Sequence, residues 1–90
     1  MAKLSEKMQR TLDSIMWRVD NARNHSYEEW LGGIGDDSFM RTEYMNNKCG
    51  IVYGWFDGRS LAALERRGIL FYWDDMERDA YCVMINETEK

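Results

Sequence analysis

Ninety residues, 44% hydrophobic and 31% charged, are enough for one small domain and too few for two domains or a large multi-substrate enzyme. The net charge is −4, and no apolar run approaches the roughly 20 residues that a membrane span needs. The first residues lack the apolar region of a signal peptide, so we expect a cytoplasmic protein with no membrane partner.

The N-terminal segment predicts an amphipathic helix over about residues 6–20, with an extension to Arg23 left open. Ser5 is a suitable N-cap. Apolar residues then recur at spacings of three and four, which places them on one helix face. They are Leu4, Met8, Leu12, Ile15, Met16 and Val19.

The middle of the chain contains a second helix-start signal. Ser26 and Glu29 have the spacing of a capping box, and Gly32-Gly33 follows as a stop. Asp36 or Asp37 is a candidate N-cap for a further helix ending near residues 46–47. The same stretch also fits the alternation of a strand, so we expect a helix there and keep the strand as an alternative.

The C-terminal half predicts a strand, a helix and a hairpin. The β-branched and aromatic run 51–56 favours a strand, Asp57 caps a helix over 58–67, and Gly68 ends it. Strand-like runs at about 69–73 and 80–85 flank the polar loop 74–79. The fold class is therefore α+β. The predicted core comprises Leu12, Ile15, Leu61, Leu64, Ile69 and Val83.

Residues 57–70, Asp-Gly-Arg-Ser-Leu-Ala-Ala-Leu-Glu-Arg-Arg-Gly-Ile-Leu, carry a family resemblance. They resemble the end of the recognition helix and the start of the wing in small bacterial and phage winged helix-turn-helix proteins. The resemblance implies a single winged-helix-like domain over 1–90, with Leu61 and Leu64 in the core and the hairpin of 69–85 as the wing. Winged helices bind DNA, RNA and proteins, so the resemblance leaves the ligand open.

One functional hypothesis uses the helix 58–67 to bind DNA. Arg59 and Arg66 fall on one outward stripe with Ala63, and Ser60 and Arg67 lie beside it. Such a stripe can enter a major groove and contact guanine or phosphate, here as a homodimeric transcriptional regulator. The alternative is structural, because basic residues in a last turn also complement the helix dipole.

The other hypothesis uses the acidic hairpin. Residues 1–73 carry ten basic and ten acidic side chains, whereas residues 74–90 carry two basic and six acidic ones. Carboxylates are repelled by phosphate, so this hairpin favours a protein partner with a basic surface, such as a nucleic-acid-handling machine. We expect a phage-type regulator or inhibitor, with anti-CRISPR-like inhibition among the options, rather than a solvated turn alone. The contact residues would be Asp74, Asp75, Glu77 and Asp79.

The sequence offers little that is typical of catalysis. Cys49, Cys82 and His25 lack the spacing of a zinc site, and we expect two reduced thiols, with a disulfide as the alternative. No phosphate-binding glycine loop or nucleophile signature is evident. We therefore expect a protein that is not an enzyme and uses no cofactor or metal.

Overall fold

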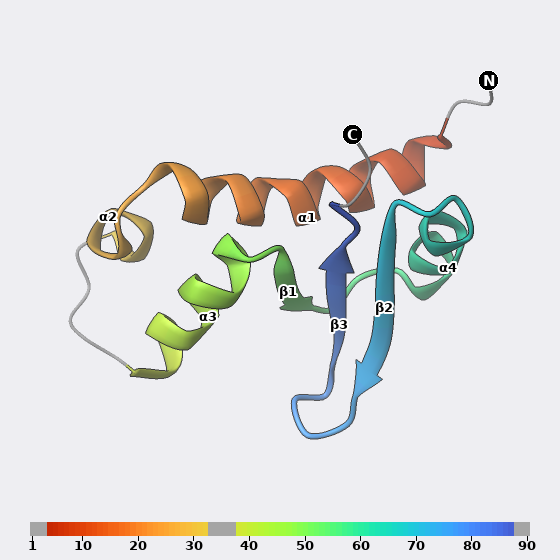
Figure 1. Cartoon of the computed structure of the whole chain (residues 1–90). Helices are drawn as coiled ribbons and strands as arrows, with labels where there is room; N and C mark the ends of the chain where they lie inside the picture. The colour runs from red at the N-terminus through yellow and green to blue at the C-terminus, as the bar shows by residue number, and fades with distance from the viewer. Residues whose placement is uncertain (1–3, 33–37, 88–90) are drawn as a thin grey trace.

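The computed structural model describes residues 4–32 and 38–87, which form a small α+β domain with a three-stranded antiparallel sheet (Figure 1). Within these two ranges, no helix combines the length and apolar composition needed to cross a membrane. The elements in chain order are α1 (Glu6–Asn24), α2 (Tyr27–Leu31), α3 (Ser38–Lys48), β1 (Ile51–Gly54), α4 (Gly58–Arg66), β2 (Leu70–Asp75) and β3 (Ala80–Ile85).

Helix α1 begins where the sequence predicts and runs four residues further. The Ser5 hydroxyl accepts a hydrogen bond from the Met8 amide at 3.2 Å, which satisfies one of the exposed amides of the first turn. The helix continues to Asn24 because its buried face extends to Ala22. It stops at His25, whose extended backbone leads into the next cap.

The predicted capping box is present at the start of α2. Ser26 accepts from the Glu29 amide at 3.2 Å, and the Glu29 carboxylate accepts from the Ser26 amide at 2.9 Å. Gly32 ends the helix in the left-handed region, with φ 76°. The segment that could also have been a strand is helical in α3, and its candidate caps Asp36 and Asp37 lie outside the described residues.

An aromatic cluster joins these two helices to the end of α1. The rings of Tyr27 and Trp30 lie 5.5 and 5.6 Å from the ring of Tyr44, and the three pack against the buried Ala22. The Tyr44 hydroxyl donates to the His25 carbonyl at 2.7 Å. This cluster holds α3 in place, and α3 forms one wall of the groove beside β1.

Helix α4 confirms both of its predicted boundary signals. The Asp57 carboxylate accepts from the amide of Ser60 at 2.9 Å, and Gly68 adopts φ 77° beyond the helix end. The helix ends at Arg66, one residue earlier than expected. Leu61 and Leu64 are fully buried.

The sheet has the order β1-β3-β2, so the hairpin strand β3 is central. Tyr53, Cys82 and Trp73 lie opposite one another across the three strands. The expected hairpin forms, but its first strand is shifted: β2 begins after Ile69 and continues to Asp75, which pairs with Ala80. The connecting turn is therefore limited to residues 76–79.

The main core lies on one face of the sheet and is built from α1, α4 and all three strands. Its buried members are Ile15, Val19, Val52, Leu61, Leu64, Leu70 and Val83. The prediction was wrong in ranking Leu12 and Ile69 with them, because both pack at its margin and stay partly exposed. In β2 the inward position belongs to Leu70, one residue later.

The other face of the sheet, called the outer face below, lies opposite to this core. Strand alternation places on it Ile51, Tyr53, Phe71, Trp73, Cys82 and Met84. Helix α3 lies beside β1, and α4, which connects β1 to β2 along the chain, lies beside β2 (Figure 1). On the outer face, Phe71, Trp73 and Met84 are exposed to solvent.

Candidate functional site

The four hairpin carboxylates occupy two different environments. Asp74 is exposed near the end of β2, and Glu77 and Asp79 are exposed in the turn. Asp75 is different: its side chain is 19% exposed and pairs with Arg78 at 3.1 Å. Its other oxygen accepts from the amides of Glu77 and Arg78 at 3.2 and 3.3 Å. Asp75 thus shapes the turn, and the three other acids form its charged surface.

The backbone of the turn explains how so short a connection is made. Asp79 has φ 52°, the left-handed conformation that Asp tolerates better than most residues other than glycine and Asn. The indole N–H of Trp55 donates to the Asp79 carbonyl. This bond connects the segment after β1 to the hairpin, so the turn and Trp55 are held together.

Large exposed hydrophobic side chains concentrate on the same hairpin. Among described residues, the exposed ones are Trp17, Met45, Trp55, Phe71, Trp73, Met76 and Met84. Four of these seven lie in the hairpin, and the Trp55 indole is hydrogen-bonded to its turn. Met76 at the tip is 87% exposed, and Phe71 and Trp73 on the outer face are 46% and 45% exposed. Contiguous exposed apolar groups rimmed by charge are typical of interaction surfaces.

Tyr53, Cys82 and Arg78 form the floor of the outer face near the turn. The Arg78 guanidinium carbon lies 4.3 Å from the centre of the Tyr53 ring. Burial, followed by a hydrogen bond with Cys82, raises the pKa of Tyr53. Burial also raises the pKa of the Cys82 thiol. Both groups therefore stay protonated near neutral pH, and this floor holds no activated nucleophile.

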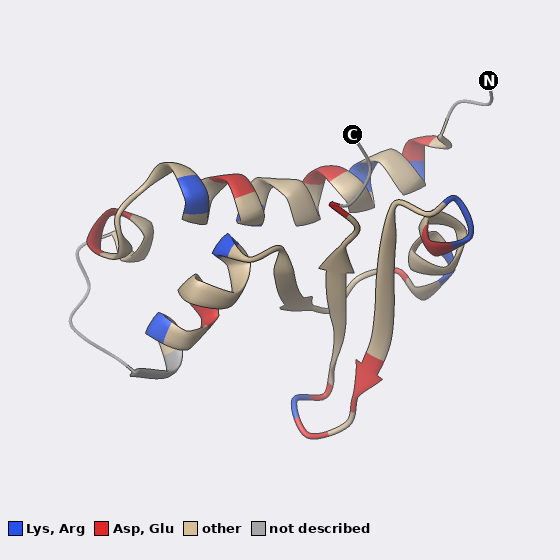
Figure 2. Cartoon of the chain, in the orientation of Figure 1, with Lys and Arg blue, Asp and Glu red and all other residues tan. Residues whose placement is uncertain are grey.

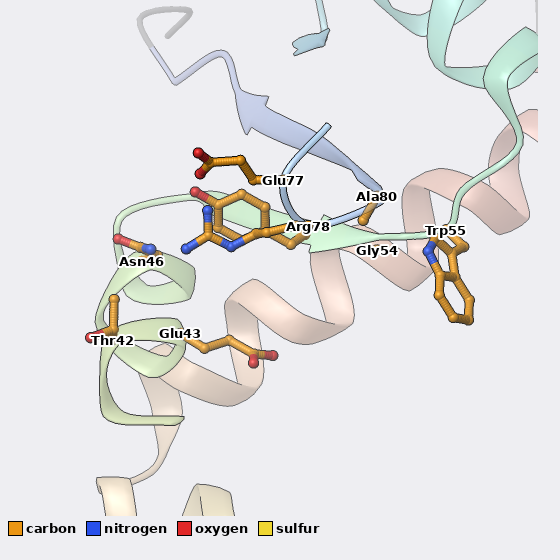
Figure 3. A pocket seen from close by; sticks show the side chains of 9 residues that line it. Thr42, Glu43, Asn46, Gly54, Trp55, Glu77, Arg78 and Ala80 are labelled. Carbon is orange, nitrogen blue, oxygen red and sulfur yellow. The ribbon is translucent and has the colours of Figure 1, made fainter. Parts of the chain in front are cut away.

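A groove of about 550 Å³ opens beside this floor, between α3 and the turn (Figure 3). Glu43 and Asn46 line it from α3, Tyr53 from β1, and Glu77 and Arg78 from the turn. Trp55 and Ala80 lie towards its other end. Two carboxylates near a guanidinium and aromatic rings suit a polar or cationic side chain better than an anion. The α3 residues could not be predicted as part of this groove, because more than thirty positions separate them from the turn.

The arginines of the alternative DNA-binding helix lie elsewhere. Arg59, Arg66 and Arg67 are exposed on α4 and at its C-terminal end. Ser60, predicted to lie beside them, is buried: its hydroxyl donates to Asp57 at 2.8 Å. Figure 2 shows the resulting separation of charge, with basic residues where α4 leads into β2 and acidic residues at the opposite end of β2.

The cysteines and the histidine of this chain lie outside the hairpin turn and form no metal site within the described residues. The described residues contain no group of three or more His, Cys, Asp and Glu side chains placed to hold a metal. Cys49 is exposed, Cys82 is buried, and the two are not joined. His25 is exposed, with Nδ1 at 3.0 Å from the Asn21 carbonyl.

Comparisons with family models, with curated proteins and with solved structures find no match to this chain.

Proposed function

We propose that this protein is a non-catalytic binding module whose hairpin contacts a partner protein with an apolar patch surrounded by Lys and Arg. One observation carries the proposal: the hairpin combines most of the exposed large hydrophobic side chains with three exposed carboxylates. In this view the domain is winged-helix-like and the hairpin is its wing. The hairpin following directly on α4 supports that description.

The two kinds of side chain would contribute differently. Exposed aromatic and methionine side chains supply most of the affinity at protein interfaces, because they remove large apolar areas from water. Met76 and Trp73 are the strongest candidates on this surface. Carboxylates at the rim act mainly on encounter rate and on the choice of partner, and salt screens them beyond about 8–10 Å. Asp74, Glu77 and Asp79 fit that role.

The groove beside the turn adds a position for one basic side chain of the partner. Glu43 and Glu77 line this groove from α3 and from the turn, and Arg78 lies between them (Figure 3), with its guanidinium over the Tyr53 ring. A Lys or Arg side chain of the partner could pair with either carboxylate at the margin of the groove. A phosphate would meet the same two carboxylates and one guanidinium that Asp75 already pairs, so repulsion would dominate.

The test titrates the protein with two fluorescently labelled synthetic peptides of equal length and equal apolar content. One peptide carries Lys and Arg, and the other carries Asp and Glu. We expect the basic peptide alone to bind, and its affinity to fall as salt is raised. The double variant Asp74→Lys with Glu77→Lys should weaken that binding at least tenfold. Trp73→Ser with Met76→Ser should weaken it while leaving the salt dependence unchanged.

A matched control makes the same change of charge elsewhere. Asp13→Lys with Asp20→Lys alters two exposed positions of α1, away from the hairpin, and should reduce binding far less. Equal weakening by both pairs, or equal binding of the two peptides, would overturn the proposal.

A parallel titration with DNA distinguishes the proposed protein binding from DNA binding by α4. A labelled random duplex should bind weakly or not at all at physiological salt. Tight binding of that duplex, lost in Arg59→Ala with Arg66→Ala, would instead establish the DNA-binding alternative.

A further inference from the structure

A second groove lies beside Trp55, at the end of the sheet that carries the hairpin turn. It has a volume of about 320 Å³ and is lined by Trp55, Phe56, Asp74, Asp79, Ala80 and Tyr81. Asp74 and Tyr81 are cross-strand neighbours, and Asp79 belongs to the turn. Trp55 and Ala80 also line the larger groove, so the two grooves adjoin at these residues (Figure 3).

The second groove combines three aromatic rings with two carboxylates whose charge is not balanced locally. Both Asp74 and Asp79 are exposed, and among the described residues neither has an ion-pair partner. None of the described residues that line this groove is Lys or Arg. The larger groove differs, because Arg78 lines it and pairs with Asp75. Of the two grooves, the second therefore has the greater excess of negative charge.

Trp55 gives the second groove an aromatic surface that is already held in position. Its indole N–H donates to the Asp79 carbonyl, yet the side chain is 84% exposed. Its two neighbours are also held: Arg18 donates to the Tyr53 carbonyl at 3.0 Å, and its guanidinium carbon lies 5.2 Å from the centre of the Phe56 ring. A side chain that binds against Trp55 therefore finds the ring in place, which reduces the conformational entropy lost on binding.

We propose that the second groove binds an arginine side chain of the partner protein, an inference that rests on the proposed function. A guanidinium is planar, so it can stack on an aromatic ring while its N–H groups donate to carboxylates. The groove offers both contacts, with Trp55 for the stacking and Asp74 and Asp79 for charge-assisted hydrogen bonds. A lysine ammonium can pair with the carboxylates but has no planar group to stack. Arginine is therefore preferred to lysine at this position.

In this arrangement Asp74 and Asp79 contact the partner directly instead of attracting it only from a distance. Alternate residues of a strand point to opposite faces, so Asp74 lies on the face opposite to Trp73. A partner that contacts Trp73 and also fills the second groove therefore reaches over the end of the hairpin, where Met76 is exposed.

The test compares two versions of the basic peptide, one with arginine at every basic position and one with lysine. The two versions have equal charge, so long-range attraction is the same for both. We expect the arginine version to bind about fivefold more tightly in the fluorescence titration. It should also shift the NMR resonance of the Trp55 indole N–H in a saturable way. That resonance is identified by its absence in Trp55→Phe.

Neutral substitutions of nearly equal shape locate the contact. Asp74→Asn and Asp79→Asn each remove one charge from the groove, and Asn tolerates the positive φ of residue 79. Each should weaken the arginine version about tenfold, mainly through faster dissociation. Glu77→Gln is the matched control, because it removes the same charge from the turn but lies outside the second groove. It should weaken both versions equally and by less.

The outcomes separate this inference from the function on which it rests. Equal affinity of the two versions would overturn the inference and leave the proposed function standing. The same follows if Asp79→Asn weakens the arginine version no more than Glu77→Gln does. Failure of both versions to bind would overturn the proposed function as well. Circular dichroism confirms that each variant is folded.

Discussion

Replacing Leu64 by alanine tests the packing of α4 against the sheet. Leu64 is fully buried, and the other buried members of its cluster come from α1, β1, β2, β3 and α4 itself. Removing its branched end deletes apolar contacts and leaves a cavity. Helix α4 packs against both α1 and β2, so closing that cavity would require more than one element to move. The cost should therefore lie in the upper part of the usual range of about 2–5 kcal/mol.

That cost is large for a chain of this size. At about 0.05–0.15 kcal/mol per residue, ninety residues give a free energy of unfolding of roughly 5–13 kcal/mol. A loss of about 4 kcal/mol should lower the thermal midpoint by roughly 16–32 °C, since each kcal/mol corresponds to about 4–8 °C in so small a domain. A stability near the lower limit would leave the variant partly unfolded at 37 °C.

Urea and thermal unfolding followed by circular dichroism provide the measurement, with two comparison variants. Leu12→Ala removes a side chain at the margin of the same core and should cost less than half as much. Arg66→Ala, at an exposed position of α4, should change stability by no more than about 0.5 kcal/mol. If Leu64→Ala proved no more damaging than Leu12→Ala, the orientation assigned to α4 would be wrong.

Three further predictions concern the cap, the thiols and the turn. Hydrogen bonds from the side chain and amide of Ser60 lower the pKa of Asp57. The stability it contributes is therefore present above the ordinary carboxyl pKa and is lost as pH falls through the lowered value. Asp57→Asn, which keeps a cap without titrating, should lose stability less steeply in urea unfolding below about pH 4; an equal slope would contradict this. A thiol reagent at about pH 8 should modify Cys49 quickly and Cys82 only after denaturation, because burial raises the pKa of Cys82 and shields it. Rapid modification of both would mean that the sheet opens readily. Asp79→Gly should raise the thermal midpoint slightly and Asp79→Val should lower it, since the residue has a positive φ; the reverse order would exclude this turn geometry.

The parts of the fold that depend on local chemistry were predictable from the sequence. Ser5, Ser26 and Asp57 each accept from the amide expected of an N-cap, and Gly68 has the left-handed backbone of a helix stop. These signals act over three or four residues, so they need no knowledge of the rest of the chain. The hairpin was also predictable, because two strand-like runs flank a polar turn.

The features that depend on distant contacts were not predictable in the same way. Asp75 has a low strand propensity, yet it lies in β2 because pairing with Ala80 and bonds to the turn stabilise it there. Ser60 lies on the arginine side in a simple helical projection, but its bond to Asp57 buries it. The groove requires α3 to lie beside the turn, a position set by the aromatic cluster. The role of the acidic turn in binding stays a prediction.

Helix α1 belongs to two cores at once, and this has a consequence for how the domain opens. Ile15 and Val19 pack in the sheet core, whereas Ala22, one turn later, packs with Tyr27 and Tyr44. The aromatic corner can therefore unfold by fraying only the last turn of α1, while the sheet core stays closed. Amide hydrogen exchange should divide the helix accordingly, with slow exchange around Ile15 and faster exchange after Asp20. One continuous helix would then report two separate stabilities.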